Sequence, residues 1–174
     1  MTILETRRLA LRLIGADDAP FILGLLNEPS FLRFIGDRGV RTLDDARAYI
    51  ENGPVASYAR HGLGLWLAQR REDGTPIGMC GLLKRDTLDD VDIGFAYLPA
   101  YWGQGYAYEA AAAVMDHGRR VLGIPRIVAI VSPDNAGSIR LLEKIGLVFE
   151  RRIDFNGEDR PTCLYVPAPT PGLP

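Results

Sequence analysis

The chain alternates between apolar and polar residues from Leu9 to Leu13, where three leucines fall on one side of an extended backbone. This period of two predicts a first β-strand with one buried face. Two helical patterns follow. The first is capped by Asp17 or Asp18 and runs to about Leu26, where Asn27-Glu28-Pro29 ends it. The second begins at Thr42 and runs to about His61, with Gly53-Pro54 expected to kink or divide it.

Short runs of apolar and β-branched residues predict six further strands. They cover about residues 63–69, 76–84, 91–98, 127–131, 147–153 and 160–166. A polar turn over residues 71–74 has the chemistry of a hairpin, so the first of these strands should form an antiparallel meander. Two more helices are expected, over about residues 105–122 and 135–145.

This order of elements predicts a three-layer α/β or α+β domain. Its sheet should be mixed, mostly antiparallel and twisted, with six to seven strands flanked by helices. The last eight residues contain four prolines, and proline cannot donate to a strand ladder, so we expect Pro167 to Pro174 to stay outside the sheet. We therefore expect one domain over residues 1–166 and a proline-rich tail over residues 167–174.

Composition narrows the class of protein. A chain of 174 residues with 47% hydrophobic composition can bury the core of one domain. The formal charge of −2 lacks the basic excess of proteins that bind nucleic acids. No apolar run reaches membrane-spanning length and the N-terminus lacks the order of a signal peptide, so a cytoplasmic protein is expected. Two cysteines, Cys80 and Cys163, are expected to be reduced core residues, and His61 and His117 lack metal-ligand spacing.

The most informative segment, Tyr101 to Ala107, lies between a predicted strand and a predicted helix and contains Gly103 and Gly105. A strand that breaks into glycines and opens directly into a helix presents several unpaired main-chain N–H groups at one point. The positive end of the helix dipole lies at the same point. The segment therefore predicts an anion site, most simply for a phosphate.

The residues that follow the second glycine argue against two known uses of such a glycine pair. A nucleotide P-loop requires a lysine and then serine or threonine after the second glycine, but Tyr106-Ala107 stand there. A dinucleotide fingerprint requires a third glycine where Tyr108 stands, at the first strand–helix turn of a parallel sheet. The glycines alone do not exclude a third interpretation, a tight loop that binds no ligand.

A second motif covers Val131 to Ser138, and residues 141–146 continue it. Together with Ile93-Gly94-Phe95, the glycine segment and Glu109-Ala110, it closely resembles the GNAT superfamily of acyl-CoA-dependent N-acyltransferases. The nearest branch is similar to the RimJ/RimL type, which acetylates protein N-termini and other amines. The resemblance extends over about residues 4–166.

The resemblance implies a site for acetyl-CoA, and the spacing of His61 and His117 leads us to expect no metal. In this family the strand before the glycine loop splays from its neighbour, and the pantetheine arm of coenzyme A pairs with main-chain groups in the gap. The pyrophosphate lies over the amides at the helix start. The cofactor-binding residues implied here are Phe95, Ala96, Tyr97, Trp102, Gly103, Gln104, Gly105, Tyr106, Ala107, Tyr108, Asn135 and Ser138.

One of these residues departs from the family pattern, and two have a second interpretation. Trp102 stands where the family usually has arginine or glutamine, which leaves the affinity open. Asn135 is placed to cap the helix that begins there, and the family implies that its amide also faces the pantetheine arm. Ser138 is either an ordinary serine of a first helical turn or a hydroxyl that reaches the sulfur of the coenzyme.

The resemblance also implies direct attack of a neutral amine on the acetyl thioester, with the oxyanion held by a main-chain N–H of the strand Phe95 to Tyr97. Many members carry a tyrosine as general acid where this chain has Leu142, so Ser138 or water must protonate the thiolate. We expect Asp92 to be the base, acting through a water, with a solvated strand residue as its alternative interpretation. The reserves for the base are Asp154 and Glu158.

The amine acceptor is the open question. In this family it is set by residues 31–39, the second helical region and the loop over residues 155–161, which here mix both signs of charge. A protein N-terminus, an amino acid, a polyamine and a drug amine all fit, and relatives allow a homodimer. An N-terminal amine, with a pKa of about 7.7–8.0, is already partly neutral near pH 7, so it depends less on a base than a lysine at about 10.4. The alternative from another class is a sensor or scaffold domain that binds acyl-CoA without turnover.

Overall fold

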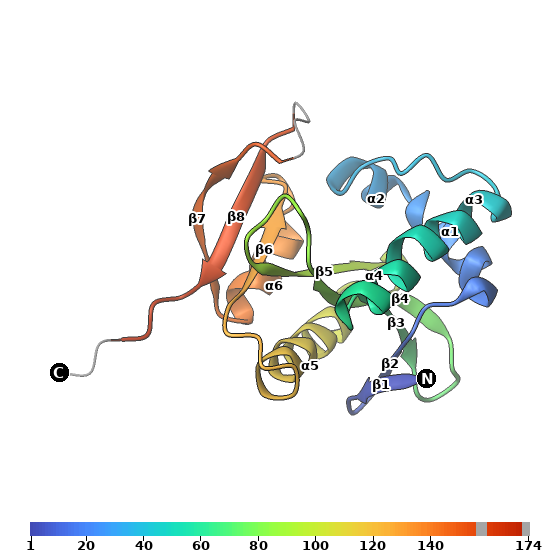
Figure 1. Ribbon diagram of the computed structural model, residues 1–174, viewed down its shortest axis with the longest axis horizontal. Helices are drawn as coiled ribbons and strands as arrows, with labels where there is room; N and C mark the ends of the chain where they lie inside the picture. The colour runs from blue at the N-terminus through green and yellow to red at the C-terminus, as the bar shows by residue number, and fades with distance from the viewer. Residues whose placement is uncertain (156–159, 172–174) are drawn as a thin grey trace.

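The computed structural model describes residues 1–155 and 160–171, and eight strands of this part form one open sheet (Figure 1). The strand order is β1-β2-β3-β4-β5-β6-β8-β7, and every neighbouring pair is antiparallel except β5 and β6, which are parallel. The strands are β1 (Thr2–Glu5), β2 (Leu9–Arg12), β3 (Leu65–Arg70), β4 (Pro76–Leu83), β5 (Val91–Tyr97), β6 (Ile127–Val131), β7 (Leu147–Ile153) and β8 (Thr162–Pro167). The predicted mixed, mostly antiparallel sheet is confirmed, with one more strand than expected, because β1 pairs with β2.

Helices cover both faces of the sheet (Figure 1). The α-helices are α1 (Ala19–Leu26), α2 (Pro29–Phe34), α3 (Leu43–Ile50), α4 (Ala56–His61), α5 (Tyr106–Arg120) and α6 (Ala136–Lys144). Helices α1 and α3 pack together on one face, and α5 packs across β4 and β5 on the other. No helix of the described residues is long and apolar enough to span a membrane.

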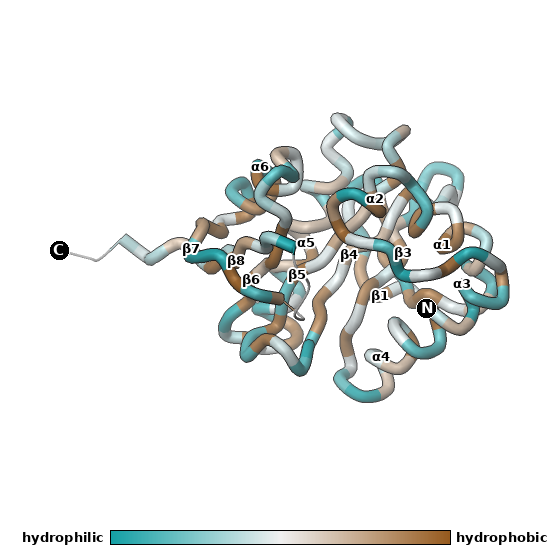
Figure 2. The backbone as a smooth tube through the Cα atoms, turned by 90° about the horizontal axis from the view of Figure 1, so that it is seen from above, coloured by the Kyte–Doolittle hydropathy of each residue, from teal (hydrophilic) through white to brown (hydrophobic). Residues whose placement is uncertain are grey.

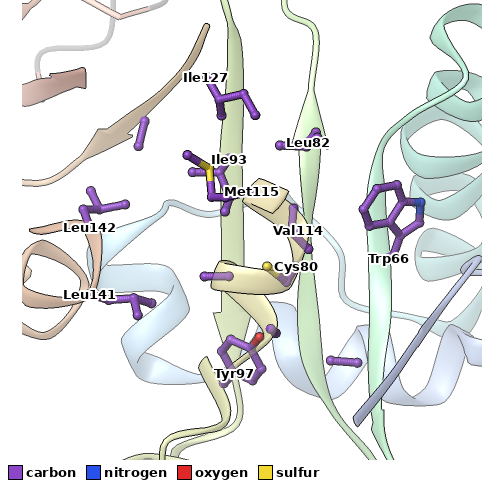
Figure 3. Packing of buried hydrophobic residues seen from close by; sticks show 14 of the residues in the cluster. Trp66, Cys80, Leu82, Ile93, Tyr97, Val114, Met115, Ile127, Leu141 and Leu142 are labelled. Atoms are coloured by element: carbon purple, nitrogen blue, oxygen red, sulfur yellow. The ribbon is translucent and has the colours of Figure 1, made fainter. Parts of the chain in front are cut away.

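Strand β3 shows why the central strands are apolar on both sides. Trp66 and Ala68 point into the cluster that contains α5, whereas Leu67 between them points into the cluster of α1 and α3. Cys80 and Leu82 of β4 lie in the first cluster against Val114 and Met115 of α5 (Figure 3). Both cysteines are free and buried, as expected.

The second helical region is divided where Gly53-Pro54 predicted a break. Thr42 caps α3, since its hydroxyl accepts a hydrogen bond of 3.1 Å from the N–H of Asp45. A single π-helical turn, Glu51–Val55, contains Pro54 and joins α3 to α4. Proline lacks the N–H of a regular helix, which accounts for the change of hydrogen-bond pattern at this point.

Two expectations were incomplete or wrong. Asn27-Glu28-Pro29 ends α1 as predicted, but Pro29 then opens the unforeseen helix α2, because proline fits the first helical position. Pro167 does join the sheet, as the last residue of β8 opposite Leu147. The missing N–H of Pro167 is tolerated because the next residue, Ala168, makes the bond to Gly146, and alternation along an antiparallel pair leaves Pro167 opposite Leu147 at a position that does not donate to β7. After β8 the chain runs away from the sheet (Figure 2).

The sheet opens between its two parallel strands. Strands β5 and β6 pair only at Val91↔Ile127 and Asp92↔Val128, although both continue beyond those residues. The main-chain groups of β5 after Asp92 therefore face a gap where a continuous sheet would have a neighbour.

Candidate active site

The gap beside β5 exposes main-chain groups of alternate residues. The N–H of Leu98 donates to Ile77 of β4 at 2.9 Å, and alternation along an antiparallel pair places those of Phe95 and Tyr97 on the opposite, open side. The carbonyls of these two residues face the same side, and that of Tyr97 accepts a hydrogen bond of 3.0 Å from the indole Nε1 of Trp102. The N–H and carbonyl of Phe95 are the groups of this strand best placed for a ligand.

The glycine loop adopts the conformation that its glycines permit. Gly103 and Gly105 have φ angles of 71° and 82°, in the left-handed region, and α5 begins at Tyr106. Within the described chain, the N–H groups of residues 103–108 make no loop hydrogen bond, whereas the next N–H, that of Glu109, donates to Gly105 at 3.0 Å. These donors converge on the start of a helix of four turns, which suits an anion.

Arg8, beside β2, fixes this loop from a distant part of the sequence. Its Nη1 donates to the carbonyl of Gln104 at 2.9 Å, its Nε pairs with Glu109 at 3.0 Å, and its guanidinium stacks on the ring of Tyr106 at 4.2 Å. The sequence gives no local sign of this role, because the two sides lie about a hundred residues apart.

A groove of about 620 Å³ runs from the glycine loop along the gap. Most of the cofactor-binding residues implied by the sequence line it: Phe95, Ala96, Tyr97, Trp102, Gly103, Ala107, Asn135 and Ser138. Four others do not line it: Gln104, Gly105, Tyr106 and Tyr108. Tyr106 is a core residue that packs on Arg8, and the ring of Tyr108 lies under Lys144 on the surface.

Asn135 is the N-cap of α6, as its position predicted. Its Oδ1 accepts a hydrogen bond of 3.3 Å from the N–H of Ser138. Both residues also line the groove. The capping role and the place in the groove are therefore compatible.

A second cavity, of about 170 Å³, adjoins the groove, and the two share Phe95, Ala96, Asn135 and Ser138 as lining residues. Asp92 lies in this second cavity, as does Leu142. Ser138 thus stands at the junction, with the glycine loop toward one end of the combined space and Asp92 toward the other. We call the first space the groove and the second the acceptor cavity.

Asp92 is a buried acid with one satisfied oxygen. Its residue is 1% exposed, and Oδ1 accepts a hydrogen bond of 2.9 Å from Nε of Arg85. Oδ2 is buried and has no hydrogen-bond partner among the described residues. Burial raises the pKa of Asp92 above its ordinary range, and the charge of Arg85 opposes this effect.

Helix α2, which the sequence did not predict, covers both spaces with Phe31, Phe34 and the adjoining Ile35. The hydroxyl of Ser132, after β6, donates to the carbonyl of Phe34 at 2.9 Å. Arg160 donates to the carbonyls of Leu32, at 3.2 Å, and Arg33. The helix is thereby tied across the gap to the second half of the sheet.

The segments implied to select the acceptor come together around the acceptor cavity. Its lining includes Phe31, Phe34, Ile35, Arg38, Tyr49, Phe155 and Arg160. Of the reserve bases, Asp154 is exposed and lies outside the lining, and Glu158 lies outside the described residues, as does Asp159. Arg85 is a further member of the cavity that the sequence did not single out.

Comparisons with known proteins bear on this arrangement. Residues 8–148 match the family model described as an acetyltransferase (GNAT) domain. The uncharacterized N-acetyltransferase YoaA of Bacillus subtilis is 32% identical over 94% of each chain. An acetyltransferase from Agrobacterium tumefaciens superposes with a TM-score of 0.78 at 26% identity, covering 93% of this chain and 92% of the other.

The fold also resembles that of a protein solved with coenzyme A, RimL, an acetyltransferase of ribosomal protein L7/L12. The TM-score is 0.82 at 18% identity, over 97% of this chain and 98% of that one. The chain therefore belongs to the GNAT family of acetyltransferases, which confirms the resemblance, the acyltransferase activity and the acetyl-CoA co-substrate that it implied.

Proposed function

We propose that this protein transfers an acetyl group from acetyl-CoA to a primary amine by direct attack within a ternary complex. The observation that carries the proposal is the continuity of the groove with the acceptor cavity at Phe95 and Ser138. A donor that enters along the glycine loop and an acceptor that enters beside Asp92 would meet there. The thioester supplies an acyl group that is already activated for transfer to nitrogen.

The chain's own groups fit the phosphates and the arm of coenzyme A. The unbonded N–H groups of residues 103–108 would receive the pyrophosphate. The open N–H and carbonyl of Phe95 would pair with the pantetheine arm, and Asn135 faces the same space. Trp102 stands where the family usually has arginine or glutamine, and its indole already donates to the carbonyl of Tyr97. Phosphate binding at this loop would therefore rely on main-chain donors.

The reaction needs two proton transfers. As the new C–N bond forms, the amine loses a proton, and Oδ2 of Asp92, unpartnered among the described residues, would accept it directly or through a water. As the C–S bond breaks, the sulfur needs a proton, which Ser138 or a water would supply, because Leu142 has none to give. A thiol with a pKa of about 8.5 is a good leaving group, so this second step requires little assistance.

The alternative is a domain that binds acyl-CoA without turnover. Release of free thiol from acetyl-CoA, measured over a panel of primary amines, amino acids and N-terminal peptides, separates the two functions. We expect thiol release that depends on the amine, with the acetylated amine found in equal amount by mass spectrometry. Tight coenzyme A binding with no release over the whole panel would instead support the sensor.

A further inference from the structure

The acceptor cavity has an excess of positive charge. Among the described residues that line it, three are arginines, Arg38, Arg85 and Arg160, and one is a carboxylate, Asp92. Arg85 is paired with Asp92. Two guanidinium groups therefore line the cavity without a carboxylate that neutralises them within the described part of the chain.

Arg38 and Tyr49 bring two hydrogen-bond donors together in this cavity. Arg38 forms no ion pair with the carboxylates of the described residues, and its neighbour Asp37 is already held by Arg41 and by the N–H of Gly39. Tyr49, Arg38 and Arg85 line the same cavity, where burial raises the pKa of Tyr49 and the two arginine charges oppose this effect. The Tyr49 hydroxyl has no hydrogen bond to the described chain.

Arg160 is held in place by main-chain groups. Its Nη2 donates to the carbonyls of Leu32 and Arg33 at the end of α2. Its charge is thus positioned at the cavity by neutral partners, and this keeps the guanidinium available to an anion.

Asp92 provides the opposite kind of group on β5. Its Oδ2 is a buried acceptor without a partner in the described chain, which suits the N–H of an amine. The acceptor cavity therefore offers an acceptor from β5 and donors from the segment after α2, from α3 and from the segment before β8. This pattern is complementary to a molecule with an amine and an acid group.

We infer, given the proposed function, that the amine acceptor carries a carboxylate that binds at Arg38, Tyr49 and Arg160. This chemistry has two sources: a free amino acid, or a peptide N-terminus followed by an acidic residue. Polyamines and other polycations are disfavoured, because they would bring like charge to a cavity that already has an excess.

Matched acceptors test the inference. Free L-amino acids are compared with their amides, tripeptides with aspartate at position two with those that have asparagine, and spermidine is included. We expect kcat/KM to be at least about tenfold higher for the acid in one of the two matched pairs, the equivalent of about 1.4 kcal/mol. The amine of an amide is the more easily deprotonated, so a preference for the acid must come from binding. Equal or better turnover of the neutral partner in both pairs, or of spermidine, overturns the inference.

Variants locate the preference. Arg38→Gln and Tyr49→Phe should raise KM for the acid and leave its neutral partner unaffected, and Arg38→Lys should keep part of the preference. Arg47→Gln is the matched control, because Arg47 is exposed on α3, pairs with Asp44 and lies outside the cavity. An Arg38→Gln enzyme that keeps the full preference overturns the assignment.

A binding measurement separates this inference from the proposed function. N-acetyl amino acids and their amides are titrated into the protein saturated with coenzyme A, and the shift in Tm is followed. Stabilisation by the acid alone, lost in Arg38→Gln, supports the carboxylate site even if no amine is turned over. Equal shifts for acid and amide, or no shift for either, overturn it.

Discussion

At the scale of single residues, the role proposed for Asp92 predicts how the rate depends on pH. Burial raises its pKa above the ordinary 3.8, with Arg85 opposing. The base acts when deprotonated, so the wild-type rate should fall as pH decreases through this raised pKa. We expect Asp92→Asn to lower kcat by about 100- to 10,000-fold near neutral pH. It should also remove the part of the acid limb that Asp92 contributes and leave the part that comes from protonation of the amine. Steady-state kinetics over about pH 6 to 9 measures both effects.

The same shift predicts what Asp92→Asn does to stability. A carboxyl whose folded pKa is raised stabilises the fold below its unfolded pKa, and this contribution is lost as pH rises through the folded pKa. Above the folded pKa the buried carboxylate carries a desolvation cost that asparagine lacks, so Asp92→Asn should not lower Tm there. Asp89→Asn, an exposed neighbour outside the cavity, is the control for kcat. A rate for Asp92→Asn that is unchanged across the pH range eliminates Asp92 as the base.

Substitution of Gly105 tests whether the glycine loop binds the phosphates of coenzyme A. A side chain at its φ of 82° is strained by about 1–2 kcal/mol, and the added Cβ would lie 3.2 Å from Nη2 of Arg8, which pins the loop. We expect Gly105→Ala to lose stability and to raise KM for acetyl-CoA. Gly74→Ala is the matched control, with a φ of 72° in the β3–β4 turn and no atom near the new Cβ. It should lose similar stability in urea unfolding without changing KM, and equal KM effects would contradict the role of Gly105.

At the scale of elements, α2 shows where sequence patterns lose information. Its six residues are too few for a helical period to emerge, and Asn27-Glu28-Pro29 gave the expected end of α1 without revealing that Pro29 opens the next helix. The longer elements, such as α5 and the central strands, were predictable because their apolar periods extend over many residues. From the sequence, the residues that α2 contributes to both spaces were therefore named only as part of the segment 31–39, and their contacts were not predicted.

Ser132 links α2 to the end of β6, and its loss should loosen the cover of the site. We expect Ser132→Ala to cost about 1 kcal/mol of unfolding free energy and to raise KM for both substrates, because Phe34 and its neighbours line both spaces. Ser57→Ala is the matched control, since its hydroxyl donates to the carbonyl of Leu63 and neither residue lines the groove or the acceptor cavity. It should lose similar stability with unchanged KM. Ser132→Ala with unchanged KM for both substrates would show that the bond does not hold the cover in place.

At the scale of the whole molecule, the order of strands and helices followed from the sequence, but the way distant segments meet did not. The glycine loop, Asn135 and Asp92 were singled out by motif, and the structure places them around one continuous space. Arg8 and Arg160 were not singled out from the sequence, because their partners lie about 100 to 130 residues away and the hydrogen bonds go partly to main-chain carbonyls. Such contacts depend on tertiary packing and leave no local pattern.

Within the described residues, strand pairing between the two halves of the sheet is limited to two pairs of residues of β5 and β6, so a ligand in the groove should add to their connection. A ligand that binds only the folded state at a hundred times its Kd stabilises it by about 2.7 kcal/mol. For a domain of this size, coenzyme A at that concentration should raise Tm by roughly 5–10 °C in a thermal scan. Pantetheine, which lacks the phosphates, should give a smaller shift at equal concentration, because the N–H groups of residues 103–108 stay unused. Equal shifts for the two compounds would remove the glycine loop from the binding site.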